Sequence, residues 1–235
     1  MPELRDDAFL LRAVDFRDHD RVLTLLTREH GTLGVLARGA RRSRKRFGGA
    51  LEPFQRLAVT WRPGRGLGTL NEALVRRSHP GLLASLARMR LAGDGTAFVR
   101  QLCVEGQGDP EVFDALDVFL AAVAEVGVAH EEGLGLAFRV RVLALFGASP
   151  ELELCGVSGE PCPPDRPAYF DPQRGTLVSR RHGGGPFLLS AGARARLRDA
   201  MQEGFEHVVF EASEVAEARP ALDAFVVAHV GKRGD

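Results

Sequence analysis

The sequence predicts an α+β protein with a five-stranded barrel at its amino end, followed by an α-helical bundle. Short apolar stretches with alternating character fill the first 80 residues, and an i, i+3, i+4 apolar spacing begins after Pro80. A segment rich in proline and glycine, residues 148–186, then interrupts the helical pattern. With 235 residues, of which 45% are hydrophobic and 26% charged, the chain is long enough for two or three small domains.

The predicted barrel occupies residues 1–79. Turn residues at 18–20, 30–32 and 63–66 stand where tight hairpin turns are needed. The oligonucleotide-binding (OB) barrel has five strands and long loops beside a groove for nucleic acid, so it is the expected fold. The strands are predicted at 9–11, 22–26, 33–36, 57–61 and 70–75.

Amphipathic segments form the predicted helical bundle of residues 80–147. They run from 82 to about 104, from 112 to 123 and from 134 to 146. Residues 148–186 are predicted to be a loop-dominated insert. In the last segment, 187–235, Ser190 is expected to cap one helix, a final helix spans about 213–230, and both should return to the bundle.

The formal charge of zero hides a strong asymmetry. Residues 1–100 carry 19 Lys and Arg against 10 Asp and Glu, whereas the rest of the chain carries 12 against 21. Six cations stand within the nine positions 38–46, between two predicted strands. Such clustering is typical of proteins that bind phosphate backbones, although a solvated basic face is the alternative for any basic run. The six are Arg38, Arg41, Arg42, Arg44, Lys45 and Arg46.

Other candidates for nucleic-acid binding lie beside this cluster. Phe47 is expected to be exposed and to stack on unpaired bases, because glycines and cations surround it. Trp61 is a second candidate for stacking, but it alternates with Val59, so it is expected in the core. Further cations on or near the fourth and fifth strands are expected along the barrel face or its rim, with protection of a strand edge as the alternative. These cations are Arg56, Arg62, Arg65, Arg76 and Arg77.

The motif at residues 39–43, Gly-Ala-Arg-Arg-Ser, continues through 48–54 and 66–70 and resembles the bacterial RecO family of recombination mediators. The helix at 138–147, which directly precedes the insert, is also similar, and the resemblance extends along the whole chain. It implies an OB-fold domain, a helical bundle and a zinc-finger-like insert. It also implies binding of single- and double-stranded DNA, annealing of complementary strands, and loading of RecA with RecR onto strands coated by single-stranded DNA-binding protein.

Two cations of the third bundle helix, Arg139 and Arg141, are candidates for partner binding. In RecO relatives a pocket of the helical domain takes the acidic carboxy-terminal tail of single-stranded DNA-binding protein, and Arg141 matches the family's arginine there. A cation on an otherwise apolar helix needs a carboxylate or an anionic ligand. An internal salt bridge to Asp117 or Glu125 is therefore the alternative.

The insert departs from the family pattern of two cysteine pairs, each with two intervening residues. Here the first pair reads Cys155 and Ser158, and the second pair reads Ser179 and His182. Structural zinc sites have four ligands, and a serine hydroxyl is a poor one. Zinc would need Cys162 as a third ligand, so the expectation is a degenerate finger held by packing, with a metal site as the alternative.

The sequence gives little support for catalysis, because it lacks a glycine-rich phosphate loop, an HExxH motif and a nucleophile elbow. No apolar run approaches the roughly 20 residues that cross a bilayer, and three cysteines do not make a disulfide framework. We expect a cytoplasmic, nucleoid-associated mediator without enzymatic activity or a membrane partner. The alternatives are an RNA-binding module of ribosome assembly or translation and a zinc-dependent hydrolase using Cys155, Cys162 and His182.

Overall fold

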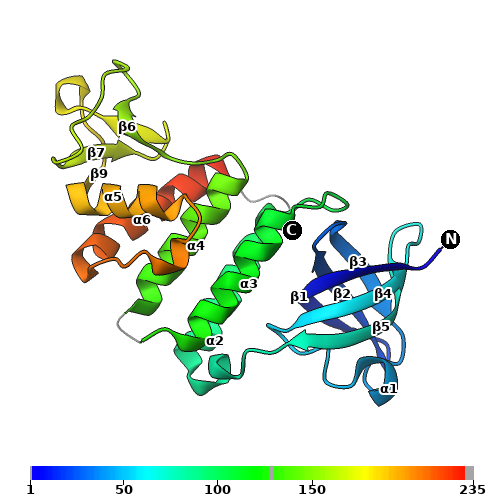
Figure 1. The fold of residues 1–235 in the computed structure, drawn as a ribbon. Helices are drawn as coiled ribbons and strands as arrows, with labels where there is room; N and C mark the ends of the chain where they lie inside the picture. Colours follow the sequence, from blue (N-terminus) through cyan, green and yellow to red (C-terminus); the bar gives the residue numbers. More distant parts are fainter. Residues whose placement is uncertain (1, 128–129, 231–235) are drawn as a thin grey trace. The chain divides into compact units, whose positions relative to one another are not determined.

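A computed structural model describes residues 2–127 and 130–230. The chain divides into two compact units, Met1–Glu125 and Val126–Asp235. The first unit holds a barrel with helices α2 and α3, and the second holds a small sheet with helices α4, α5 and α6 (Figure 1). The domain borders predicted after residues 79, 147 and 186 rest on changes in apolar spacing and in proline and glycine content. They stay predictions.

The strands of the first unit close into a barrel in the order β1-β2-β3-β5-β4, which confirms the predicted five-stranded fold. Pairing is antiparallel except between β3 and β5, which run parallel and complete the barrel. Every predicted strand lies within an observed one. The strands are β1 (Leu4–Phe16), β2 (Asp20–Thr27), β3 (Gly31–Ala37), β4 (Arg56–Arg62) and β5 (Gly68–Arg77).

Every second side chain of a barrel strand points inward, and these side chains form the core of the barrel. Leu23 and Leu25 on β2 are fully buried, and Val59 and Trp61 on β4 are nearly so. All four belong to one apolar cluster. The prediction that Trp61 is a core residue is therefore confirmed.

The cationic loop between β3 and β4 also contributes to this core. It contains the short helix α1 (Arg44–Phe47), which Ser43 caps and which lies at one end of the barrel (Figure 1). Phe47 is only 3% exposed and packs in the barrel core with Ala50 and Leu51. The expectation of an exposed Phe47 is wrong, because neighbouring glycines and cations do not reveal that a single helical turn directs the ring inward.

Helices α2 (Leu86–Leu102) and α3 (Pro110–Glu125) follow the 3-10 turn Pro80–Ala84. They pack closely, since a side chain at Gly95 would meet the ring of Phe119 at 2.3 Å. Phe113 on α3 contacts Phe9 on β1, with ring centroids 4.8 Å apart. Aromatic packing therefore joins the helices of this unit to its barrel.

The second unit combines helices α4 (Glu131–Leu145), α5 (Ala191–Ala200) and α6 (Ala212–His229) with a four-stranded sheet in the order β6-β8-β7-β9. Ser190 caps α5 as predicted, accepting a hydrogen bond from the Ala193 amide at 3.1 Å. The insert is less loop-like than expected, because its strands are too short for alternation to reveal them. Strands β6 (Glu151–Cys155), β7 (Ala168–Asp171) and β8 (Thr176–Val178) lie within it, and β9 (Phe187–Leu189) follows directly after its predicted end. None of the described helices is long and apolar enough to span a membrane.

Candidate nucleic-acid interface

The loop at 38–46 presents exposed cations and is fixed to the rest of the barrel at its start. The Gly39 amide donates to Asp20 Oδ1 at 2.8 Å, and the Arg41 amide donates to the His19 carbonyl at 3.3 Å. These two bonds fasten the loop to the turn between β1 and β2. The side chain of Arg44 lies outside the part of the structure that is described. The exposed members are Arg38, Arg41, Arg42, Lys45 and Arg46.

Internal contacts engage one of these cations, Arg46. Its Nη2 donates to the Arg38 carbonyl at 2.7 Å, and its guanidinium lies over the ring of Phe47, 4.9 Å from the centroid. Arg46 therefore shapes the loop. Arg41 and Arg42, which follow the fixed start of the loop, are the better placed to meet a phosphate.

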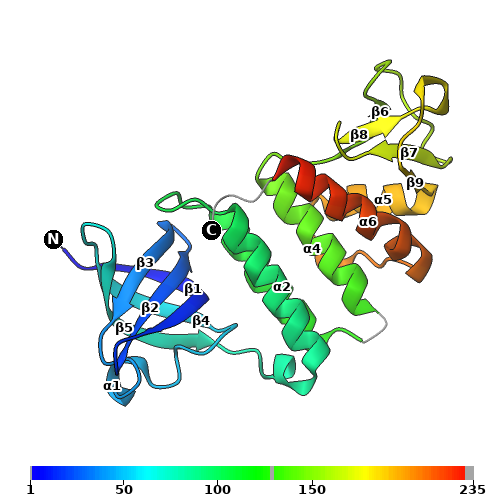
Figure 2. The same cartoon turned by 180° about the vertical axis from the view of Figure 1, so that it is seen from behind.

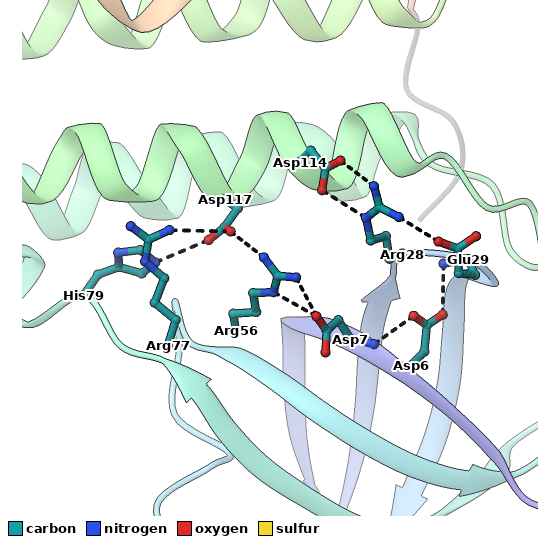
Figure 3. A network of polar contacts seen from close by, with 9 residues as sticks. All are labelled: Asp6, Asp7, Arg28, Glu29, Arg56, Arg77, His79, Asp114 and Asp117. Atoms are coloured by element: carbon teal, nitrogen blue, oxygen red, sulfur yellow. Dashed lines mark hydrogen bonds and ion pairs between the residues drawn. The ribbon is translucent and has the colours of Figure 1, made fainter.

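Arg56, predicted to contact DNA, is instead held between two carboxylates (Figure 3). It donates to Asp7 on β1 and, at 2.8 Å, to Asp117 on α3. Its side chain is 28% exposed, and the hydrogen bond with Asp7 raises the pKa of the guanidinium. Arg77 lies 3.6 Å from the same Asp117 carboxylate but is 54% exposed. We infer that Arg56 serves the junction between barrel and helix and not DNA binding, because its Nε, Nη1 and Nη2 all donate to these carboxylates.

A second ion pair, which was not predicted from the sequence, completes this junction. Arg28 makes a two-point contact with Asp114, at 2.7 and 3.1 Å (Figure 3). Asp114 and Asp117 lie three residues apart on one face of α3. The signal in the sequence was the spacing of these two acids among the apolar residues in the middle of the helix. His79 lies beside this junction with Nε2 3.8 Å from Asp117, and burial lowers its pKa.

The other predicted strand cations face solvent. Arg65 lies in the turn between β4 and β5 and is exposed, as is Arg76 on β5. Arg62 is 62% exposed and pairs with Glu3 at 3.1 Å. These three side chains are therefore accessible to an anionic ligand on the barrel.

On α4, both predicted partner-binding cations have internal contacts. Arg139 Nη1 donates to Asp223 Oδ1 at 2.6 Å, and Arg141 Nη1 donates to the Met201 carbonyl at 2.8 Å. Asp117, named above as the alternative partner of Arg141, pairs with Arg56 instead. Asp223 is 52% exposed, so an incoming carboxylate could compete with it for Arg139.

The four positions expected to form the finger lie around the thiol of Cys155. They are Cys155, Ser158, Ser179 and His182. The Ser179 amide donates to Cys155 Sγ at 3.4 Å, and His182 Nδ1 lies 3.9 Å from that sulfur. His182 Nδ1 is also 2.8 Å from Ser179 Oγ. A hydrogen bond from the Ser158 side chain lowers the pKa of Cys155 to about 5. Hydrogen bonds from hydroxyl and amide groups thus surround the sulfur.

These residues do not fit a structural zinc ion. Cys162 does not join Cys155 and His182, and no three His, Cys, Asp or Glu side chains of residues 2–127 and 130–230 are grouped to hold a metal. The described side chains therefore do not bring together the three ligands set out as the alternative. The physical reason is that serines stand in two of the four positions, leaving one thiol and one imidazole where four strong ligands are needed.

Arg194 on α5 organises the insert instead, and nothing in the sequence pattern singled it out. Its side chain is 3% exposed and donates to four backbone carbonyls. A planar guanidinium with five donors suits such a task. The carbonyls belong to Pro163 at 2.7 Å, Arg166 at 2.8 Å, Leu152 at 3.1 Å and Cys162 at 3.2 Å.

Comparisons with known proteins cover nearly the whole chain. Residues 1–79 match the family described as Recombination protein O N terminal, and residues 84–234 match Recombination protein O C terminal. A DNA repair protein RecO of Anaeromyxobacter sp. (strain Fw109-5) is 37% identical, over 98% of this chain and 92% of its own length. Proteins of the same name from Geobacter sulfurreducens and Myxococcus xanthus are 32% and 34% identical, each over 99% of this chain and 95% of its own.

Proposed function

Because the chain belongs to the RecO family of DNA repair proteins, we propose that it binds DNA and mediates recombination without being an enzyme. In this proposal the barrel binds single- and double-stranded DNA and anneals complementary strands. Together with RecR, the protein helps to load RecA onto strands coated by single-stranded DNA-binding protein. The observation that carries the proposal is the row of exposed cations at 38–46, fastened by two hydrogen bonds to a closed barrel.

Annealing follows from the physics of these cations. Two complementary strands repel each other through their phosphates, and bound cations release the condensed counterions of both strands. Guanidinium groups match phosphate oxygens without reading base edges, so binding is independent of sequence. Arg41 and Arg42 thereby bring two strands together while their bases remain free to pair.

Protein partners are proposed for the second unit. The acidic carboxy-terminal tail of single-stranded DNA-binding protein would meet Arg139 by displacing the exposed carboxylate of Asp223, with Arg141 nearby on the same helix. The exchange replaces one carboxylate by another, so it leaves no buried charge unpaired. RecR and, through it, RecA are the further partners in this proposal.

An annealing assay tests the proposed function. Two complementary labelled strands, one coated with single-stranded DNA-binding protein, are mixed with the protein, and pairing is followed by fluorescence. We expect wild-type protein to accelerate pairing and the double variant Arg41→Glu/Arg42→Glu to lose most of this effect. The control Arg90→Glu/Arg196→Glu makes the same charge change at exposed positions away from the loop. No acceleration by folded wild-type protein would contradict the proposal, and preferential binding of structured RNA would favour the RNA-binding alternative.

A further inference from the structure

We propose that the β1–β2 hairpin carries a stacking site for an unpaired base, centred on Phe16, and that this site favours single-stranded over double-stranded DNA. The inference rests on the proposed DNA binding and deepens it. Among the described large apolar side chains that are exposed, Phe16 is the one aromatic ring, at 41% exposure. The two aromatic residues singled out in the sequence, Phe47 and Trp61, are both 3% exposed and cannot meet a base.

A β-bulge directs Phe16 outward. Ala8 and Leu10 on β1 point into the barrel core, and plain alternation would send Val14 and Phe16 inward with them. The register shifts by one residue between Leu10 and Arg12, so Val14 pairs with Val22. Val22 points outward, because the next residue on β2, Leu23, points into the core. Directly paired residues share a face, so Val14 and Phe16 point outward. Bulges commonly re-aim side chains beside functional sites.

The residue after Phe16 supports the ring from one side. Arg17 has φ +53°, a left-handed conformation that an arginine rarely adopts. Its guanidinium lies over the Phe16 ring, 5.1 Å from the centroid. Backbone strain of this kind gathers at functional sites, where it holds a side chain in a required place. Here it places a cation against an exposed ring, which is the combination that binds a base and its phosphate.

The hairpin turn and the cationic loop are adjacent. The hydrogen bonds from Gly39 to Asp20 and from Arg41 to His19 connect them directly. Figure 2 shows β1, β2 and β3 as neighbouring strands of the barrel. In this proposal a strand whose phosphates lie on Arg41 places a base against Phe16 on the neighbouring hairpin.

The acidic charges around the ring are balanced by cations. Arg12 lies on the outward face of β1 with Phe16. The carboxylate of Asp15 accepts a hydrogen bond from Arg21 at 2.9 Å, and Asp20 accepts one from the loop backbone. Asp18 is the exposed acid at the turn itself. The cations Arg12, Arg17 and Arg21 thus compensate the acids of the hairpin.

Selectivity follows from what each part contacts. The arginine loop meets phosphates, which single strands and duplexes both offer. A ring can stack only on a base that is not already stacked in a duplex, since extracting a paired base costs free energy. Phe16 should therefore add to single-strand affinity alone.

Fluorescence anisotropy with a labelled single strand and a duplex of equal length tests this proposal. Phe16→Ala is expected to weaken single-strand binding about 10-fold, as typical for one lost base–aromatic stack, and to change duplex binding by less than about 2-fold. The salt dependence should keep its slope, because no cation is removed. Phe16→Trp, which keeps an aromatic face, should bind single strands like the wild type, and circular dichroism verifies that each variant is folded.

Equal weakening for both ligands, or unchanged single-strand affinity in folded Phe16→Ala, would overturn the stacking site. These outcomes differ from a failure of the proposed function, in which the wild-type protein itself would bind neither DNA. Binding of both DNAs by the wild type with a selective loss in Phe16→Ala supports the inference.

Discussion

The guanidinium of Arg56 donates a hydrogen bond to the carboxylate of Asp117 across 2.8 Å, and so joins strand β4 of the barrel to helix α3. The same guanidinium also holds Asp7 on β1. In sequence, Arg56 looks like any other cation of a basic barrel. Its three-dimensional partners make it part of the scaffold that supports the cationic loop.

Removing Arg56 should destabilise the first unit. Arg56→Leu removes the charged donor of Asp7 and leaves Asp117 with the more distant Arg77, so we expect the free energy of unfolding to fall by about 2 kcal/mol. Urea denaturation measures the change. Arg76→Leu removes an equal charge from an exposed position of β5 and should change the stability by less than about 0.5 kcal/mol. Equal effects of the two substitutions would contradict the structural role of Arg56.

Truncation of Phe47 should act on stability rather than on base stacking. Phe47→Ala leaves a cavity in the barrel core, and we expect a loss of about 3 kcal/mol in the free energy of unfolding. Phe16→Ala, at an exposed ring, serves as the matched control and should cost less than about 0.5 kcal/mol. A stable Phe47→Ala variant that has lost single-strand affinity would restore the role expected from the sequence.

Arg194 is expected to be irreplaceable by lysine. One ammonium group cannot reach four carbonyls spread over residues 152–166, so Arg194→Lys should leave buried acceptors unpaired and cost roughly 2 kcal/mol or more. Arg196→Lys, on the same helix and exposed, is the control. Thermal unfolding of both variants gives the comparison, and an unchanged midpoint for Arg194→Lys would refute the assignment.

The thiolate of Cys155 should make stability depend on pH. Its folded-state pKa of about 5 lies below the value near 8.5 of an unfolded chain, so the unfolded state binds more protons between these values. The contribution is fully present above about pH 8.5 and is lost as the pH falls through 5. Urea unfolding at pH 6 and pH 8 should show wild-type protein gaining more stability at pH 8 than Cys155→Ser does. Parallel pH profiles for the two proteins would contradict the prediction.

Local pattern was enough to predict much of the fold. All five barrel strands and the Ser190 cap follow from alternation and turn chemistry, which act over a few residues. The sheet of the insert was missed because its strands have only three to five residues. The bulge that turns Phe16 outward was missed because one extra residue leaves no mark on composition.

The candidate site was predictable where it depends on exposure and charge alone. Arg41 and Arg42 follow a glycine in a highly charged run, and they are exposed as expected. Arg56 could not be assigned, because its partner Asp117 lies 61 residues away on another element. Tertiary contacts decide whether a cation pairs with a carboxylate or stays free to bind DNA. A short sequence pattern does not show these contacts.

The salt dependence of single-strand binding tests the central claim most directly. Anisotropy titrations of wild-type protein and Arg41→Ala/Arg42→Ala over a series of salt concentrations give the slope of log K against log salt. We predict a steep slope for the wild type and a decrease of about 1.4 in its magnitude for the double variant, since each phosphate contact of a single strand contributes about 0.7. An unchanged slope in a folded double variant would show that the loop does not hold the phosphates.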